Sequence, residues 1–347
     1  MTERRARPAA RVLTAAGLQE LDLSALADLL AGLGAPGLPV TWVHCETEPG
    51  VIQALDDMGL DEVSVKSLRD GPERPRVEEF SDHLYVSLFS ADQAARRRPR
   101  RSGDDLARAA KPESNVSDTL LPRLNELRLF LGARWIISVG RFREADYDAL
   151  VERVKRQVFS RDRGPSFVAY HICEWLVETL QPALERLDDR VDALEDDVVL
   201  TTGESSVQTL FGLKRDLVDL RRRVAPLRDV MQRLGAHGVL YVDREAEVYF
   251  RDVHDDVLRV IELLDTYRDI LSSALDLHLS SVSNRLNRVM KQLTVVATVF
   301  MPLSFITGLF GTNFELMPFG SLTLFILMFV FMFVSVAAIL LYTWRRT

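Results

Sequence analysis

Two stretches near the C-terminal end of the chain contain no charged side chain, whereas charged residues are frequent in everything that precedes them. The first covers residues 292–313 and the second covers residues 316–344. Each is longer than the roughly 20 apolar residues that a helix needs to cross ~30 Å of hydrocarbon. We therefore predict transmembrane helices at residues 292–313 and 321–343. A short loop with Pro and Gly, at residues 314–320, connects them.

Basic residues flank the two predicted membrane helices on one side only. Arg285, Arg288 and Lys291 precede the first helix, and residues 344–347 form a basic tail after the second. The connecting loop carries Glu315 and no basic residue. Because Lys and Arg near membrane helices are retained on the cytoplasmic side, we expect a multi-pass protein of the plasma membrane with both termini in the cytoplasm.

The first half of the chain alternates short β-rich runs with amphipathic segments, which predicts an N-terminal cytoplasmic α/β domain over residues 1–164. A Pro-initiated segment at residues 49–58 predicts a helix. We expect a mobile start in the Pro/Arg-rich residues 1–11. The predicted strands are residues 40–44, 84–89, 126–131 and 135–139.

Glycine and proline become scarce after residue 164, and residues 165–244 predict a pair of helices. The first extends to residue 200 and the second to residue 234, with a break at residues 201–204. The first helix is rich in Asp and Glu and the second in Lys and Arg, so the charge signs are segregated. We interpret both as solvated faces that attract each other or a neighbour. A divalent-ion role for the acidic run is the alternative, although carboxylates on a helix surface do not by themselves fix a ligand geometry.

Residues 245–291 predict a long stalk helix that continues into the first membrane helix. Apolar residues recur in it at alternating spacings of four and three, which indicates a coiled-coil seam. The seam first comprises Val253, Val257, Val260, Leu264, Tyr267 and Leu271. After His278 it shifts by one residue and continues as Val282, Leu286, Val289, Leu293, Val296 and Phe300.

A stripe of mostly small and polar residues runs beside the seam at the same spacing. It comprises Asp276, Ser280, Ser283, Asn287, Met290, Thr294, Ala297, Met301, Ser304, Gly308 and Gly311. Inside a membrane, such a face either lets helices pack closely or lines a water-filled path. Close packing does not explain why the same face carries Asp276 and Asn287 before the membrane, whereas a shared axial channel does. The predicted pore-lining residues are Asn287, Met290, Leu293, Thr294, Ala297, Met301, Ser304 and Gly308.

Charge and cysteine content narrow the classes of partner. The net charge of −7 argues against a general nucleic-acid binder and suits a cationic partner. The basic run at residues 96–101 lacks interleaved aromatic residues and lies in a polar connection, so we interpret it as a solvated loop and expect no nucleic-acid partner. Cys45 and Cys173 are far apart in the sequence, so neither a disulfide framework nor a thiolate metal site is indicated.

The turn after the first predicted membrane helix resembles the signature of the CorA family of divalent-cation channels, an aromatic-Gly-Met-Asn turn followed by Phe-x-x-Met-Pro. Here it stands as Phe310-Gly311-Thr312-Asn313-Phe314-Glu315-Leu316-Met317-Pro318. The likeness extends upstream to about residue 245, and the α/β domain fits the family more loosely. The resemblance implies a funnel-shaped homopentamer, in which the first membrane helices line one pore and membrane lipid surrounds them.

The resemblance also implies a selectivity filter formed by Gly311, Thr312 and Asn313. Mg²⁺ gives up its water reluctantly, so five Asn313 side chains would hold the hydrated ion by outer-sphere hydrogen bonds. Thr312 replaces the methionine of the family signature, and variants at this position occur in the zinc-transporting ZntB-like branch. We expect transport of Mg²⁺ and Co²⁺, with Ni²⁺ as a further candidate. A proton-coupled Zn²⁺ transporter is the alternative.

Two further features of the family correspond to residues of this chain. Met290, Leu293 and Met301 resemble a hydrophobic constriction, where a narrow apolar collar empties of water and blocks ions. Asp276 and Asp92 correspond to the carboxylates of a regulatory metal site between cytoplasmic domains. Bound cytosolic Mg²⁺ would hold the pore closed there, and its loss would let like charges repel and the pore open.

Two other classes of function fit the sequence less well than transport does. A membrane-anchored sensor or scaffold would need only the hydrophobic hairpin, and neither the polar stripe nor the Gly-Thr-Asn turn. An enzyme is not indicated, because the six His residues are scattered and no H-x-x-x-H, P-loop or G-x-S-x-G pattern occurs.

Overall fold

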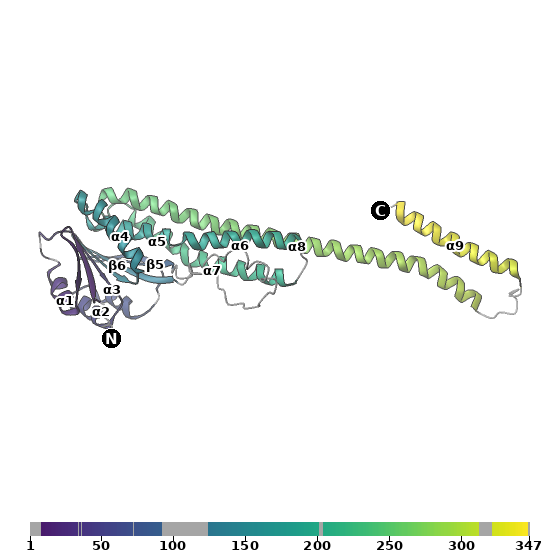
Figure 1. Cartoon of the computed structure of the whole chain (residues 1–347), viewed down its shortest axis with the longest axis horizontal. Helices are drawn as coiled ribbons and strands as arrows, with labels where there is room; N and C mark the ends of the chain where they lie inside the picture. Colours follow the sequence, from purple (N-terminus) through teal and green to yellow (C-terminus); the bar gives the residue numbers. More distant parts are fainter. Residues whose placement is uncertain are drawn as a thin grey trace, which may run out of the picture. The chain divides into compact units, whose positions relative to one another are not determined.

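The computed structural model of the chain describes residues 8–33, 35, 37–71, 73–91, 124–200, 204–311 and 321–345 (Figure 1). The basic run at residues 96–101 lies outside these ranges. The chain divides into two compact units, and the division falls inside the long helix α8 (Arg244–Gly311). The first unit comprises Met1–Asp197 and Glu204–Ser272, and the second comprises Val198–Gly203 and Ser273–Thr347.

A seven-stranded sheet forms the centre of the N-terminal region, with the strand order β2-β1-β3-β7-β6-β5-β4. Strands β3 and β7 pair in parallel, and all other neighbours pair antiparallel. The strands are β1 (Ala10–Thr14), β2 (Gly17–Leu21), β3 (Thr41–Cys45), β4 (Arg76–Glu79), β5 (Leu84–Ala91), β6 (Leu124–Leu131) and β7 (Trp135–Gly140).

Four of these strands, β3, β5, β6 and β7, lie where the sequence predicts them, and the other three do not follow from its pattern. The hairpin of β1 and β2 begins at Ala10, so the mobile start expected at residues 1–11 is wrong for Ala10 and Arg11. Strand β4 is an edge strand in which three of four residues are charged. Edge strands with charged side chains lack the apolar alternation that identifies a strand from sequence.

Helices cover both faces of the sheet, which is why every residue of β3, β5 and β7 is buried (Figure 1). Helices α1 (Leu23–Gly32), α2 (Pro49–Asp57) and α3 (Glu62–Arg69) share one hydrophobic core with Val43 and Cys45 of β3. The alternate side chains Trp42 and His44 contact the ring of Tyr147 in α4 (Glu144–Gln157), with ring centroids 5.5 and 5.0 Å apart. Alternate side chains of β3 therefore pack on opposite faces of the sheet, one set against α1, α2 and α3 and the other against α4.

The single helix predicted from residue 165 to residue 200 is wrong, because two helices occupy this region. They are α5 (Pro165–Glu178) and α6 (Gln181–Leu200), separated at Thr179 and Leu180. The Thr179 hydroxyl donates to the Leu176 carbonyl at 2.6 Å and accepts the Ala91 amide of strand β5 at 3.0 Å. The break is thus fixed by this tertiary contact, and Pro182 in the first turn of α6 is its local signal in the sequence.

Three long helices complete the described chain. Helix α7 (Glu204–Leu234) has 31 residues and continues through Pro226. Helix α8 has 68 residues and continues through Pro302. Helix α9 (Leu322–Arg345) has 24 residues, with Arg345 as its one charged side chain. Within the described ranges, one helix, α8, is long and apolar enough to cross a membrane, and α9 contains the shorter apolar stretch Phe325–Ile339.

Candidate functional site

The first half of α8 is held against its own chain by the predicted apolar seam. All six members are buried, which agrees with the spacing of four and three residues. They are Val253, Val257, Val260, Leu264, Tyr267 and Leu271. Since this half of the seam is covered within the chain, it needs no second copy to exclude water.

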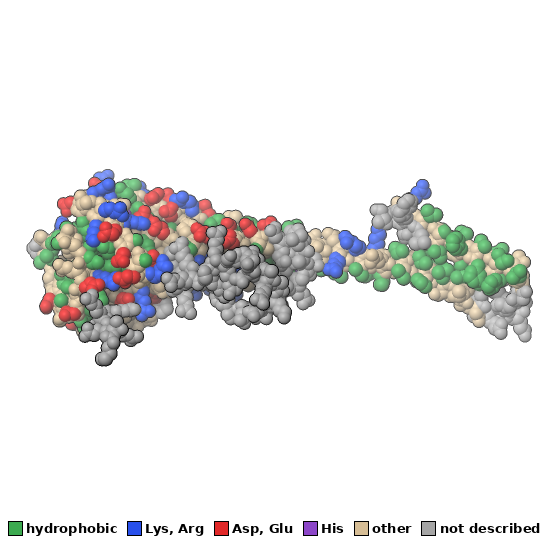
Figure 2. Space-filling view, viewed as in Figure 1, with side chains coloured by type: hydrophobic (Ala, Val, Ile, Leu, Met, Phe, Trp, Pro, Cys, Tyr) green, Lys and Arg blue, Asp and Glu red, His purple; other side chains and the backbone are tan. Residues whose placement is uncertain are grey.

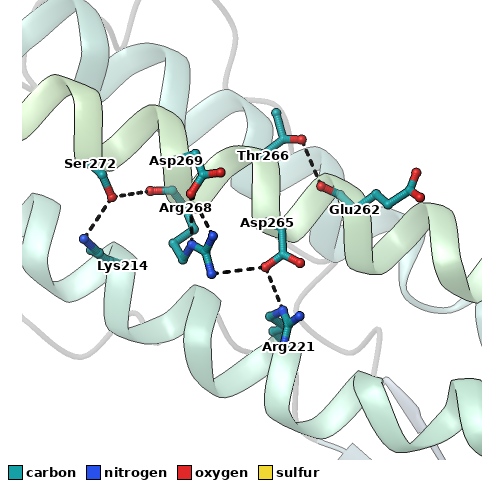
Figure 3. A network of polar contacts seen from close by, with 8 residues as sticks. All are labelled: Lys214, Arg221, Glu262, Asp265, Thr266, Arg268, Asp269 and Ser272. Atoms are coloured by element: carbon teal, nitrogen blue, oxygen red, sulfur yellow. Dashed lines mark hydrogen bonds and ion pairs between the residues drawn. The ribbon is translucent and has the colours of Figure 1, made fainter.

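Polar contacts fasten the same half of α8 to helix α7 (Figure 3). Arg221 of α7 donates to Asp265 of α8 at 2.7 Å, and the Lys214 ammonium donates to the Ser272 hydroxyl at 2.9 Å. The sequence suggests that the basic face of α7 attracts acidic α6 or a neighbour. The described contacts instead direct two of its cations to α8. Asp265 lies in a stretch of α8 that contains both acidic and basic residues, so the sequence does not indicate it as the partner of Arg221.

A partly buried hydrogen bond joins α6 to α8. The Tyr267 hydroxyl donates to the Asp188 carboxylate at 2.7 Å. Burial and the negative charge of Asp188 raise the pKa of Tyr267, so the phenol keeps its proton and remains a donor. Asp188 belongs to the acidic run of α6, so at least one of its carboxylates serves the internal structure and is not free for a cation.

The second half of α8 is exposed along the face that the sequence predicts to line a pore. Each predicted pore-lining residue is exposed in the single chain: Asn287, Met290, Leu293, Thr294, Ala297, Met301, Ser304 and Gly308. The continued seam is uncovered as well, with only Val282 half-buried among its members. A helix face that carries both polar groups and large apolar groups in the open requires further surfaces to cover it.

Large apolar side chains dominate the exposed end of α8. Met290, Leu293 and Met301 are 59%, 64% and 73% exposed. Figure 2 shows hydrophobic side chains along this end of α8 and along α9, with Lys and Arg just before them. An exposed apolar surface of this extent marks a contact with other protein or with a membrane, and the basic residues Arg285 and Arg288 precede it on the same helix.

Hydroxyl groups on this part of α8 are oriented by their own helix. The Thr294 hydroxyl donates to the Met290 carbonyl at 2.8 Å, and the Thr298 hydroxyl donates to the Thr294 carbonyl at 2.7 Å. A hydroxyl that has used its proton in this way can still accept hydrogen bonds. Pro302 brings no amide hydrogen to the Thr298 carbonyl, which adds a further acceptor. Such acceptors suit the water shell of a cation.

The predicted regulatory carboxylates are not brought together within the described chain. Asp276 lies on α8, is exposed, and forms no ion pair with a described residue. Asp92 lies outside the described residues. Over the described ranges, no group of three His, Cys, Asp or Glu side chains could hold a metal ion. Within the described part of the chain, Asp276 therefore belongs to no such group of ligands.

The predicted filter begins where α8 ends. Gly311 is the last residue of α8 and is exposed, and a Cβ placed there would meet no atom within 4 Å. Thr312 and Asn313 lie outside the described residues. Gly311, the first residue of the predicted filter, thus lies on the same helix as the predicted pore face.

One charged cluster in the first unit was not singled out from the sequence. Glu174 of α5 accepts from Tyr170 at 2.8 Å, lies 3.1 Å from Nδ1 of His171 and pairs with Arg153 at 3.0 Å. Burial opposes the charge of Glu174, but these hydrogen bonds and the guanidinium outweigh burial and lower its pKa to about 2. The partners come from α4 and α5, so the cluster joins two helices.

Known proteins similar to this chain over most of its length include metal-ion transport proteins. The cobalt/magnesium transport protein CorA of Thermotoga maritima is 40% identical over 283 residues, which cover 80% of this chain and 73% of that protein. The zinc transport protein ZntB of Pectobacterium carotovorum is 25% identical over 285 residues, which cover 80% of this chain and 78% of that protein.

The fold and the family are shown by two further matches. The complete structure of the CorA magnesium transporter from Methanocaldococcus jannaschii superposes with a TM-score of 0.72 at 22% identity and covers 97% of this chain and 98% of that one. The family model described as CorA-like Mg²⁺ transporter protein matches residues 39–345. The chain belongs to the CorA-like Mg²⁺ transporter family.

Proposed function

We propose that this protein transports divalent metal cations across the plasma membrane, Mg²⁺ and Co²⁺ first and Ni²⁺ as a further candidate. The observation that carries the proposal is the exposed second half of α8. There a polar face runs along a helix whose end is apolar enough to cross a membrane. A polar face is costly in lipid, so it indicates a water-filled path. The membership of the CorA-like family supports the same function.

The path requires several copies of α8 around one axis, and we propose a homopentamer with α8 lining the pore. The uncovered seam at Leu286 and Leu293 supports assembly, because 61% and 64% of these side chains are exposed in the single chain. Helix α9 would be the second span and would face lipid. Its apolar sequence, with Arg345 at the end, supports a hairpin whose two outer ends are cytoplasmic.

Ion selection is proposed at Gly311, Thr312 and Asn313. A ring of five Asn313 side chains offers neutral oxygen acceptors to the waters of a hydrated ion, and no charged group is needed. Below it, Met290 and Met301 would form an apolar collar that blocks ions when it is dry. The Thr294 hydroxyl, whose proton is held by the Met290 carbonyl, would accept water hydrogens between the two methionines.

Regulation by cytosolic metal is proposed at Asp276. One exposed carboxylate does not hold Mg²⁺ firmly, so a second carboxylate from a neighbouring copy, with Asp92 as the candidate, would complete the set. Bridging metal would hold the copies together and favour the closed state. When the metal leaves, repulsion between the carboxylates would favour the open state.

Transport of Mg²⁺ and Co²⁺ is favoured over proton-coupled transport of Zn²⁺. The relative named for cobalt and magnesium is 40% identical, whereas the relative named for zinc is 25% identical over a similar length. The proposed filter also lacks His, Cys or an extra carboxylate that would strip water from Zn²⁺. Thr312 changes the signature without adding such a ligand.

The test is uptake into liposomes that contain the full-length protein, measured for Mg²⁺, Co²⁺, Ni²⁺ and Zn²⁺ with a pH dye inside. We expect Mg²⁺ and Co²⁺ to enter without a change in internal pH. Asn313→Ala should abolish uptake and leave the oligomer intact in size-exclusion chromatography. Zn²⁺ flux coupled to acidification, with no Mg²⁺ flux, would replace this proposal with the zinc alternative, and unaltered uptake by Asn313→Ala would refute the filter.

A further inference from the structure

A groove of about 330 Å³ lies on the first compact unit, between helices α7 and α8. Four of its eight lining residues are arginines, namely Arg74, Arg221, Arg222 and Arg268. The other four are apolar, and they include the buried Leu217 and Leu264 and the exposed Val218. The groove therefore combines a cluster of fixed positive charge with an apolar wall.

The positive charge of the groove is only partly neutralised. Arg221 lies 2.7 Å from Asp265, and Arg268 lies 3.5 Å from Asp265 and 2.8 Å from Asp269 (Figure 3). Figure 3 shows Arg221 reaching Asp265 from the facing helix α7, whereas Arg268 reaches it from the next turn of α8 itself. Arg74 and Arg222 form no ion pair with any described residue. Among the described residues, two of the four guanidinium groups that line the groove thus have no counter-charge in ion-pair contact.

Four guanidinium groups around one hollow repel each other and exclude a metal cation. The arrangement is stable when an anion occupies the hollow, and the planar fork of arginine matches phosphate oxygens through paired hydrogen bonds. More than one phosphate is needed to engage arginines that come from α7, from α8 and from the segment before β4. The apolar wall around Val218 leaves room for a group without charge beside them.

We propose that this groove binds a polyphosphate anion, in which two or more linked phosphates bridge Arg74 and Arg222 to the Arg221–Arg268 pair. This inference goes beyond cation transport and does not depend on which ion crosses the membrane. Two sources share this chemistry, a nucleoside triphosphate and an inorganic polyphosphate. A nucleoside would additionally contact the apolar wall, so the two sources are separable by affinity.

Isothermal titration of the purified full-length protein in detergent, with EDTA present, tests the proposal. The probes are ATP, inorganic tripolyphosphate and adenosine. We expect saturable binding of both phosphate compounds, weakening as salt is raised, and no binding of adenosine. Tighter binding of ATP than of tripolyphosphate assigns the groove to nucleotides, and equal binding assigns it to inorganic polyphosphate.

Two sets of variants locate the site. Arg74→Gln with Arg222→Gln removes the two arginines that have no described ion pair, and both side chains are exposed, so folding should be retained. We expect roughly tenfold weaker binding for each arginine removed. Arg223→Gln is the matched control, because Arg223 is an exposed neighbour on α7 that does not line the groove.

Two results would contradict the proposal at different levels. Binding that survives in the double variant, or that falls equally in Arg223→Gln, would overturn the assignment to this groove. Absence of saturable binding by the intact oligomer would overturn the proposal itself and would indicate that another surface, such as an acidic helix of a second copy, covers the arginines. Because binding is measured without transport, failure here is distinguishable from failure of the cation-transport proposal.

Discussion

Replacement of Leu271 by alanine tests whether the stalk is held by its own chain. Leu271 is 1% exposed in the buried half of the α8 seam. The substitution removes three carbon atoms, which at ~0.8 kcal/mol per buried CH₂ amounts to about 2.4 kcal/mol of lost burial. The cavity left behind raises the expected loss in the free energy of unfolding to about 3–5 kcal/mol.

The matched control is the same substitution at Leu286, fifteen residues further along the same seam and helix. Leu286 is 61% exposed, so Leu286→Ala should change the free energy of unfolding by no more than about 0.5 kcal/mol. Both changes replace leucine by alanine inside a helix, so their effects on helix propensity cancel in the comparison.

Urea unfolding of a soluble fragment of residues 1–291, followed by far-ultraviolet circular dichroism, measures both variants. With an m value of about 3 kcal/mol per M, a loss of about 3 kcal/mol lowers the midpoint by about 1 M for Leu271→Ala. The midpoint of Leu286→Ala should stay close to that of the parent. Equal shifts in the two variants would show that the two halves of the seam do not differ in the single chain, which would refute the reasoning.

Three further predictions address the proposed sites. Asp276→Lys should make uptake less sensitive to internal Mg²⁺, because a fixed cation replaces a bridged carboxylate; protection from proteolysis by Mg²⁺ that equals the parent's would place the regulatory site elsewhere. Thr312→Met should keep transport and change ion affinity only modestly in the liposome assay, since Asn313 still supplies the acceptors, and loss of flux would show that the hydroxyl itself is required. The pKa of Glu174 is lowered to about 2 from an ordinary value of 4.5. The contribution of its charged form to stability is therefore complete above about pH 4.5 and is lost as the pH falls from there toward about 2. The parent fragment should therefore lose more urea resistance than Glu174→Gln between about pH 5 and about pH 3, and equal losses would contradict the assignment.

The part of the fold that the sequence predicts is the part with apolar periodicity. Strands β3, β5, β6 and β7 are apolar runs buried on both faces, and α8 repeats its apolar positions over many turns. The hairpin β1–β2 and the edge strand β4 have no such pattern, because their stability comes from pairing with a neighbour. The break between α5 and α6 is indicated in the sequence only by Pro182, whereas the contact of Thr179 with the Ala91 amide of a distant strand has no local sequence pattern.

The candidate site divides in the same way. Residues that share one face of a helix can be identified from their spacing in the sequence, so the exposed stripe on α8 could be predicted. The internal partners of the stalk could not, because Arg221 selects Asp265 from several carboxylates on α6 and α8 by position and not by charge. Arg221 and Arg222 belong to the basic run of α7, but no pattern in the sequence places Arg74 beside them, because it comes from a distant part of the chain.

The geometry of the stripe adds a constraint on how copies of α8 could surround a pore. From Asp276 to Gly311 the stripe keeps its spacing of four and three through five heptads. A straight α-helix drifts by about 20° per heptad relative to that repeat, which amounts to about 100° over the whole stripe. Straight parallel helices would therefore turn one end of the stripe away from a common axis. A left-handed supercoil removes the drift, and the seam that lies one residue before the stripe, at Leu286 and Leu293, then faces the adjacent copy along its whole length. The same spacing thus accounts both for a polar face toward an axis and for an apolar flank toward a neighbour.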